Sequence, residues 1–138
     1  YTHWQTPDFG IYPLEETVEA MMKLKEQGKI RAIGASNVTA DLIRGYCRYG
    51  QLDVIQEKYS LLTRRIEKQL LPTCRELGVS VQAYSPLVIA LTARMIPGLH
   101  VLCGARTPEQ VLDNAGALNI KLDGADAVRM KWDVDAIS

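Results

Sequence analysis

The sequence predicts an α/β fold in which parallel strands are joined by crossover helices. Short apolar runs alternate with longer amphipathic stretches along the 138 residues. The expected strands begin near residues 30, 53, 79 and 99, a rhythm that is typical of repeated strand–helix units. Because parallel strands need a crossover of roughly a dozen residues or more, each amphipathic stretch is long enough to make one connection.

The first third of the chain predicts a helix, a strand and a second helix. Apolar side chains recur at helical spacing over residues 14–24, and Gly28 is expected just beyond the helix end. The elements expected next are a strand over residues 30–34, a polar turn at Ser36 and Asn37, and a helix over residues 39–48 with Thr39 as its N-cap.

The remaining chain repeats the alternation. The expected elements are strands over residues 53–56, 79–84 and 99–102, a helix over residues 66–77 closed by Gly78, a helix opening at Thr107, and a last helix from Asp123 to about Trp132. The start at Thr107 is strongly marked, because Pro108 suits the first helical position and Gln110 completes a capping box. Its expected inward face consists of Val111, Leu112, Ala115 and Leu118.

Composition excludes several classes of partner. The chain carries 16 Lys and Arg against 16 Asp and Glu, so it lacks the basic footprint of a protein that binds nucleic acid or anionic membranes. No stretch approaches the roughly 20 apolar residues of a membrane span, and no signal peptide is visible. Cys47, Cys74 and Cys103 lie too far apart for a metal site and are odd in number, so we expect no metal and a cytoplasmic location.

Two α/β architectures fit this periodicity, an open doubly wound sheet and a (β/α)8 barrel. A whole barrel takes about 250 residues, so this chain would hold four or five of its eight units. No linker divides the chain, and residues 1–138 are expected to form a single domain. At one point the pattern lacks a loop, because Leu87 runs directly into a helical stretch over residues 88–91. We therefore expect a loop to be missing after Leu87.

Polar and aromatic residues follow the expected strands at their carboxyl ends, where parallel α/β folds bind ligands. They are His3, Trp4 and Gln5, then Ser36 and Asn37, then Gln56, then Tyr84 and Ser85, and finally residues 104–107. The last group is a Gly-containing turn that enters a helix, which suits a phosphate group. Amide and hydroxyl side chains suit a carboxamide, and a Tyr ring suits stacking. The pattern predicts a phosphorylated ligand with an amide-bearing or aromatic group.

Each of these residues also has a purely structural interpretation. His3 could be a buried histidine bonded to a backbone carbonyl, Ser36 and Asn37 an ordinary turn and cap, Gln56 a rim residue, Tyr84 a core aromatic and Arg106 a solvated charge. The functional interpretation depends on all of them converging at one edge of the sheet.

Five segments, in one order and register, carry a family resemblance. They are His3-Trp4 with its neighbours, GKIRAIGASN at 28–37, VIQ at 54–56 followed by YSLL at 59–62, VQAYSPL at 81–87, and GARTPEQV at 104–111. Together they resemble the C-terminal half of the aldo-keto reductases, (β/α)8-barrel oxidoreductases that use NADP(H). The resemblance implies a TIM barrel of which this chain covers roughly strands 4 to 8 and their helices.

The resemblance also implies roles for individual residues. His3 would orient the substrate carbonyl, and Trp4 would line the substrate pocket. Ser36, Asn37 and Gln56 would hold the nicotinamide carboxamide, Tyr84 would stack on the nicotinamide ring, and Ser85 and Leu87 would lie beside the pyrophosphate. Gly104, Ala105, Arg106 and Thr107 would line the adenosine 2′-phosphate site, with Gln110, Asp113 and Asn114 nearer the ribose and adenine.

The implied function is NADP(H)-dependent reduction of aldehydes or ketones, with a small-molecule carbonyl substrate. This chain would supply the cofactor-binding half. The family's proton-donating Tyr and its Lys and Asp partners belong to the first half of the barrel and have no match here, so we expect these 138 residues not to turn over substrate by themselves. The alternative is a catalytically inactive nucleotide-binding or regulatory subunit, or a half-barrel fragment. Oligomer formation is possible in either case.

Overall fold

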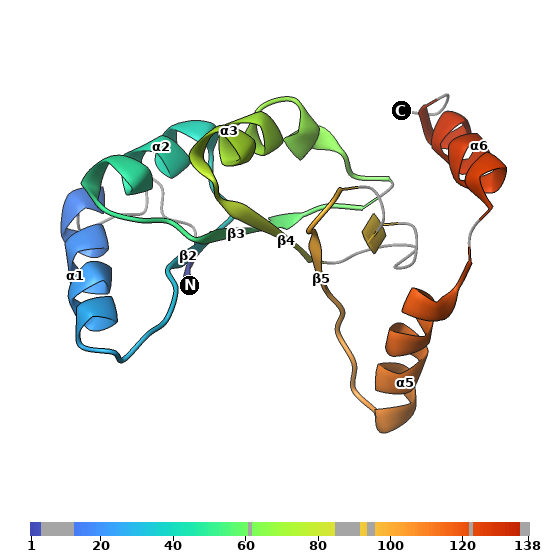
Figure 1. Ribbon diagram of the computed structural model, residues 1–138, viewed down its shortest axis with the longest axis horizontal. Helices are drawn as coiled ribbons and strands as arrows, with labels where there is room; N and C mark the ends of the chain where they lie inside the picture. Colours follow the sequence, from blue (N-terminus) through green and yellow to red (C-terminus); the bar gives the residue numbers. More distant parts are fainter. Residues whose placement is uncertain (4–12, 61, 85–91, 94–95, 122, 136–138) are drawn as a thin grey trace. The chain divides into compact units, whose positions relative to one another are not determined.

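The computed structural model describes residues 1–3, 13–60, 62–84, 92–93, 96–121 and 123–135 (Figure 1). The described chain divides into two compact units. The first consists of Tyr1–Glu57 and Ile66–Gln82, and the second of Lys58–Arg65 and Ala83–Ser138. None of the helices in the described ranges is both long and apolar enough to cross a membrane.

The first unit is built on four neighbouring strands and includes most of their residues. They are β1 (Thr2–His3), β2 (Gly34–Ser36), β3 (Val54–Lys58) and β4 (Ser80–Tyr84). β1 pairs with β2 and β2 with β3, both in parallel. The strands are ordered as they occur in the sequence. A doubly wound sheet reverses its order at a switch point, whereas a barrel does not, so the order distinguishes the two architectures.

Three helices connect and cover these strands. They are α1 (Leu14–Glu26), α2 (Ala40–Tyr49) and α3 (Leu70–Leu77). α1 packs on α2 and α2 on α3, and Figure 1 shows α2 and α3 along one side of β3 and β4. The expected helix signals at Thr39 and Gly78 are confirmed. The Thr39 hydroxyl accepts a 3.2 Å hydrogen bond from the Leu42 backbone, and Gly78 adopts φ 68° just past α3.

Alternate residues of the strands build the core of this unit. Ala35, Ile55 and Val81 are buried, as are Ile43 and Tyr46 of the neighbouring helix α2. The buried Tyr46 hydroxyl shares a 2.5 Å hydrogen bond with the Thr2 side chain. Because side chains alternate between the faces of a strand, His3, Ser36, Gln56 and Gln82 belong to the opposite face. That opposite face carries the predicted functional residues of this unit.

The strand predicted over residues 30–34 is wrong in its bounds, because β2 begins at Gly34 and ends at Ser36. Ile33 is held by Asp53 instead of a strand neighbour. Its backbone nitrogen donates to the Asp53 carboxylate at 2.7 Å, and its carbonyl accepts from the Asp53 backbone at 2.9 Å. A side chain 20 residues away thus satisfies backbone groups that a local pattern assigns to a sheet.

The helix predicted over residues 66–77 is also corrected. A 3₁₀ turn, η1 (Arg65–Glu67), comes first, and α3 begins only at Leu70. Pro72 explains the interruption, because a proline inside a helix has no N–H to donate and clashes with the carbonyl four residues earlier. Starting the helix at Leu70 places Pro72 in the first turn, where these costs vanish.

The second unit contains the end of β4, β5 (His100–Leu102), α5 (Pro108–Gly116), the 3₁₀ turn η2 (Ala117–Asn119) and α6 (Gly124–Asp135). β5 follows β4 in the strand order. The expected inward face of α5 is wrong: Leu112 is 72% exposed, Val111 55% and Leu118 66%, and Ala115 is exposed too. Among the described residues no element covers this face. The helical periodicity therefore predicts correctly that a helix forms here, but it does not predict which face of the helix is buried.

Candidate functional site

Three side chains meet where β2 and β3 end, and we call Ser36, Asn37 and Gln56 the amide cluster. The Ser36 hydroxyl donates to the Gln56 carbonyl at 3.0 Å, and Asn37 Nδ2 donates to the Ser36 hydroxyl oxygen at 3.2 Å. Ser36 and Gln56 are direct partners in the parallel register. Ser36 is only 1% exposed, whereas the two amide side chains are half-buried. Ser36 therefore orients the Asn37 amide, and the two amides form the accessible part of the cluster.

Asn37 turns the chain out of β2 in an unusual conformation. Its φ of 57° lies in the left-handed region, and among the described residues it is the one non-glycine with positive φ. Asn tolerates this region better than most residues, at a cost of about 1 kcal/mol or more. The turn is held from both sides: the Asn37 backbone nitrogen donates to the Gln56 carbonyl at 3.1 Å, and the Val38 backbone nitrogen donates to the Glu57 carboxylate at 2.6 Å.

Gln82, which was not among the predicted site residues, extends the cluster onto β4. Its Oε1 accepts a hydrogen bond from Gln56 Nε2 at 3.0 Å and another from the Tyr1 hydroxyl at 2.8 Å. The period-two pattern of residues 79–84 carried a usable signal, because it put Gln82 on the same polar face as Tyr84. That Gln82 meets Gln56 follows only from the pairing of β4 beside β3.

His3 ends β1 next to the amide cluster. Its Cα is the register partner of Ser36, and its side chain is exposed. The structural alternative of a buried histidine is therefore wrong for the residues that the structure describes. Trp4, predicted to line the substrate pocket, lies outside the described residues, as do Gln5, Ser85 and Leu87. Tyr84 is described and ends β4, where it is half-buried.

In the second unit, the predicted phosphate-site residues form a turn that leads into α5. Thr107 is the N-cap, and its hydroxyl accepts from the Gln110 backbone at 3.3 Å. The Gln110 side chain accepts from the Arg106 backbone at 2.7 Å, one residue before the position that a capping box normally uses. Asn114 Nδ2 donates to the Gly104 carbonyl at 3.1 Å. The structure thus brings Gly104, Arg106, Thr107, Gln110 and Asn114 together.

Two side chains of opposite charge, Arg106 and Glu109, lie at this turn. The Arg106 side chain is exposed. The space beside Gly104 is open, because a Cβ added there would meet nothing within 4 Å. Glu109 also lies at the helix start, where hydrogen bonds from its own backbone N–H and from the Thr107 hydroxyl lower the pKa of its carboxyl. Ala105 and Asp113 are exposed. An anion bound here would gain from Arg106 and would lose from the charge of Glu109.

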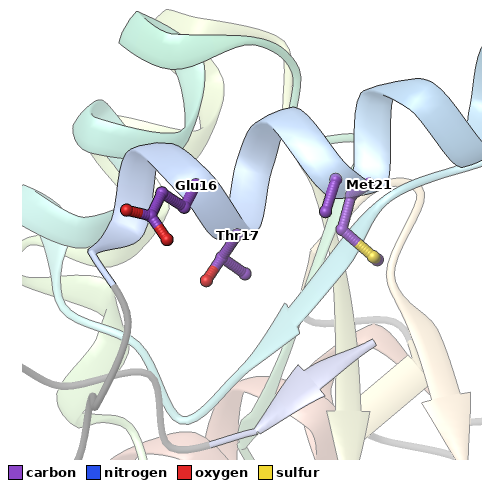
Figure 2. A pocket seen from close by; sticks show the side chains of 4 residues that line it. Glu16, Thr17 and Met21 are labelled. Carbon is purple, nitrogen blue, oxygen red and sulfur yellow. The ribbon is translucent and has the colours of Figure 1, made fainter.

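The first unit also has a hollow beside α1, lined by residues other than those of the amide cluster. It has a volume of about 390 Å³ and is lined by Glu16, Thr17, Ala20 and Met21 of α1. Figure 2 shows Glu16, Thr17 and Met21 on one side of that helix. None of these residues was predicted to bind a ligand, and none contributes to the amide cluster. Among the described residues, the lining of the hollow comes from α1.

Parallel strands in sequential order, with helices between them and polar groups at their carboxyl ends, define part of a (β/α)8 barrel. The model of the aldo/keto reductase family matches residues 1–96. The chain belongs to this family.

Similar proteins agree with that assignment. The NADH-specific methylglyoxal reductase of Escherichia coli (strain K12) is 37% identical over 190 residues, which takes in 99% of this chain and 58% of that protein. A crystal structure of an aldo/keto reductase from Klebsiella pneumoniae in complex with NADP and acetate is 30% identical, with a TM-score of 0.76 over 93% of this chain and 55% of that one. The thermostable aldo-keto reductase Tm1743, crystallised with the inhibitor epalrestat, is 28% identical, with a TM-score of 0.79 over 94% and 57%.

The chain spans a little over half the length of these relatives. The stretch aligned with the E. coli protein is 190 positions long, against 138 residues here. That relative therefore has residues without a counterpart in this chain.

Proposed function

We propose that this chain is the cofactor-binding half of an NADP(H)-dependent oxidoreductase that reduces small aldehydes or ketones to alcohols. The observation that carries the proposal is the amide cluster at the ends of β2 and β3, where Asn37 and Gln56 are fixed and half-buried. A nicotinamide carboxamide has one oxygen that accepts and one –NH2 that donates, and Asn and Gln side chains complement both.

The residues present fit the nicotinamide end of such a cofactor. Among the described residues no partner is found for Gln56 Oε1, while Gln56 Nε2 is already bound. A half-buried amide oxygen without a hydrogen-bond donor costs free energy. The –NH2 group of a carboxamide would supply that donor. Tyr84, at the end of β4, is assigned to the ring, on which its aromatic side chain would stack.

His3 is assigned to the carbonyl substrate. The bound nicotinamide supplies the hydride, and the protein's part is to orient the reacting groups. An exposed imidazole at the end of β1, in register with Ser36, can donate an N–H to the substrate oxygen and hold it toward the ring. The family's proton-donating Tyr has no match in these 138 residues, so we propose that they bind cofactor without turning over substrate.

The phosphate end of the cofactor is assigned to the turn before α5. Arg106 supplies an exposed guanidinium for the 2′-phosphate, and Thr107 starts the helix. Gln110, Asp113 and Asn114 are assigned to the ribose and adenine. Glu109 favours a second candidate, NAD(H), because its low-pKa carboxylate repels a 2′-phosphate at the same helix start. The NADH-specific E. coli relative is compatible with this candidate.

We also propose that a loop is missing after Leu87, beside the pyrophosphate residues Ser85 and Leu87. The longer aligned stretch of the E. coli relative supports this proposal, since a loop present there and absent here would produce it.

Calorimetric titration of the chain with NADP⁺ and with nicotinamide-free 2′,5′-ADP tests the function. We expect both to bind, and we expect Gln56→Leu to weaken NADP⁺ about tenfold, the equivalent of roughly 1.4 kcal/mol, without changing 2′,5′-ADP. Gln27→Leu, the same substitution at an exposed residue after α1, serves as the control. The proposal fails if NADP⁺ does not bind, or if Gln56→Leu weakens both ligands equally.

A further inference from the structure

The amide oxygen of Gln82 is shared by two donors. Gln56 Nε2 lies 3.0 Å from it, and the Tyr1 hydroxyl lies 2.8 Å from it. All three residues belong to the first unit. A carbonyl oxygen has two lone pairs, so Gln82 Oε1 is saturated by protein donors.

This contact determines which end of the Gln56 amide faces away from β4. A glutamine amide can present either its oxygen or its –NH2, and the two ends have the same shape. Nε2 donates one of its two hydrogens to Gln82, which holds this end of the amide toward β4, whereas Oε1 has no partner among the described residues. A ligand at Gln56 therefore meets an acceptor oxygen that no donor among the described residues has satisfied.

We propose that Gln82 is a positioning residue that fixes the Gln56 amide with its oxygen toward the cofactor, so that the site selects a nicotinamide whose carboxamide carries an –NH2 group. This inference rests on the proposed function and adds to it a determinant of ligand chemistry. Gln82 itself touches Gln56 rather than the cofactor ring.

Tyr1 reinforces the arrangement through the second hydrogen bond to Gln82. Its ring lies against Gly34, where an added Cβ would be 2.6 Å from the ring carbon Cε1. Burial raises the pKa of the Tyr1 hydroxyl above its usual value, so this hydroxyl keeps its proton and donates. With two donors aimed at its oxygen, the Gln82 amide loses part of its freedom to flip.

The test compares NADP⁺ with 3-acetylpyridine adenine dinucleotide phosphate, in which a methyl group replaces the –NH2 of the carboxamide. For the wild-type chain we expect NADP⁺ to bind roughly tenfold more tightly, since one hydrogen bond to the half-buried Gln56 oxygen is lost in the analogue. In Gln82→Leu the Gln56 amide is released, and we expect the affinity ratio to fall to about three or less. Gln82→Glu should restore the ratio, because a carboxylate oxygen still accepts from Gln56 and Tyr1.

Several controls separate this role from a general loss of structure. The affinity for 2′,5′-ADP should be unchanged in Gln82→Leu, and Gln27→Leu should leave the ratio at the wild-type value. If Gln82→Leu does not fold, as judged by circular dichroism, Tyr1→Phe provides a second test. It removes one of the two donors to Gln82, and the affinity ratio of NADP⁺ to the analogue should fall to a value between about ten and about three.

The outcomes distinguish this inference from the proposed function. If NADP⁺ binds but the wild-type ratio is near one, or if the ratio is unchanged in both Gln82→Leu and Tyr1→Phe, the positioning role is overturned while dinucleotide binding stands. If Gln82→Leu weakens 2′,5′-ADP as well, the residue is merely structural and the inference fails. If the wild-type chain binds neither dinucleotide, the proposed function itself fails.

Discussion

The backbone nitrogen of Asn37 lies 3.1 Å from the carbonyl oxygen of Gln56, and this hydrogen bond joins the ends of β2 and β3. It is made at φ 57°, a conformation that few L residues accept. The same two residues supply the half-buried amides of the proposed nicotinamide site. The backbone turn and part of the proposed ligand contact thus both depend on Asn37, and substitutions of Asn37 can separate these two roles.

We expect Asn37→Gly to keep the fold and to weaken cofactor binding. Glycine accepts positive φ without a steric cost, whereas the amide that we propose for nicotinamide binding is lost. The predicted result is an unchanged or higher melting temperature and NADP⁺ affinity lowered about tenfold, a change of roughly 1.4 kcal/mol. Asn37→Ala should lose the same affinity and also about 1 kcal/mol of stability. A glycine variant that binds NADP⁺ as tightly as the wild type would remove Asn37 from the site.

Arg106→Ala is expected to change the choice between phosphorylated and unphosphorylated cofactor. Loss of a charge-assisted hydrogen bond of about 1.5–3 kcal/mol should weaken NADP⁺ by tenfold or more and leave NAD⁺ nearly unaffected. Glu109→Gln should strengthen NADP⁺ binding relative to NAD⁺, since it removes a negative charge from the start of α5. Competition titrations give the affinity ratio, with exposed Arg31→Ala as the control. An unchanged ratio in Arg106→Ala would favour NAD(H).

Two glycines should respond in opposite directions to alanine. A Cβ at Gly50 would lie 2.7 Å from Val18 Cγ1, and Val18 is fully buried and cannot move aside. We expect Gly50→Ala to cost about 1–3 kcal/mol. Gly116 in α5 has open space and helical φ, so Gly116→Ala should gain about 0.5–1 kcal/mol. Urea unfolding measures both. Equal effects at the two positions would contradict the packing of α1 against α2.

Cys74 makes stability depend on pH in the alkaline range. Burial, followed by the neighbouring Cys47 and Glu57, raises the pKa of this thiol from 9.0 to about 11. Above pH 9 the unfolded chain releases the proton before the folded chain does, so the free energy of unfolding should fall as pH rises toward 11. For one proton the slope is about 1.4 kcal/mol per pH unit. Cys74→Ala should show a shallower slope in urea titrations between pH 8 and 10.5. Cys103→Ala should reduce the slope less, because burial also raises the pKa of that thiol but the shift at Cys74 is the large one. Equal slopes in the wild type and Cys74→Ala would refute the assignment.

Local signals in the sequence predicted the parts of the fold that local interactions decide. The Thr107 cap, the left-handed Gly78 and the alternation of β4 all depend on neighbours within a few residues, and all are confirmed. The start of β2 depends on Asp53, which lies 20 residues from Ile33, and was predicted too early. The face of α5 depends on what packs against it, which periodicity does not record.

The candidate site divides in the same way. Ser36, Asn37 and Gln56 were recognisable because strand ends and family motifs mark them, and the structure brings them within hydrogen-bond distance. Gln82 was missed because its partner Gln56 is 26 residues away, and only the pairing of β3 beside β4 brings the two amides together. No composition or spacing rule reports a contact of that kind.

The central claim is that Asn37 and Gln56 hold the nicotinamide carboxamide. The most direct measurement is the nuclear magnetic resonance spectrum of the side-chain amides of ¹⁵N-labelled chain, recorded with NADP⁺ and with 2′,5′-ADP. We predict that the Asn37 and Gln56 side-chain signals shift with NADP⁺ and stay in place with saturating 2′,5′-ADP. Signals that remain unmoved when NADP⁺ is bound, or that move equally with both ligands, would contradict the account.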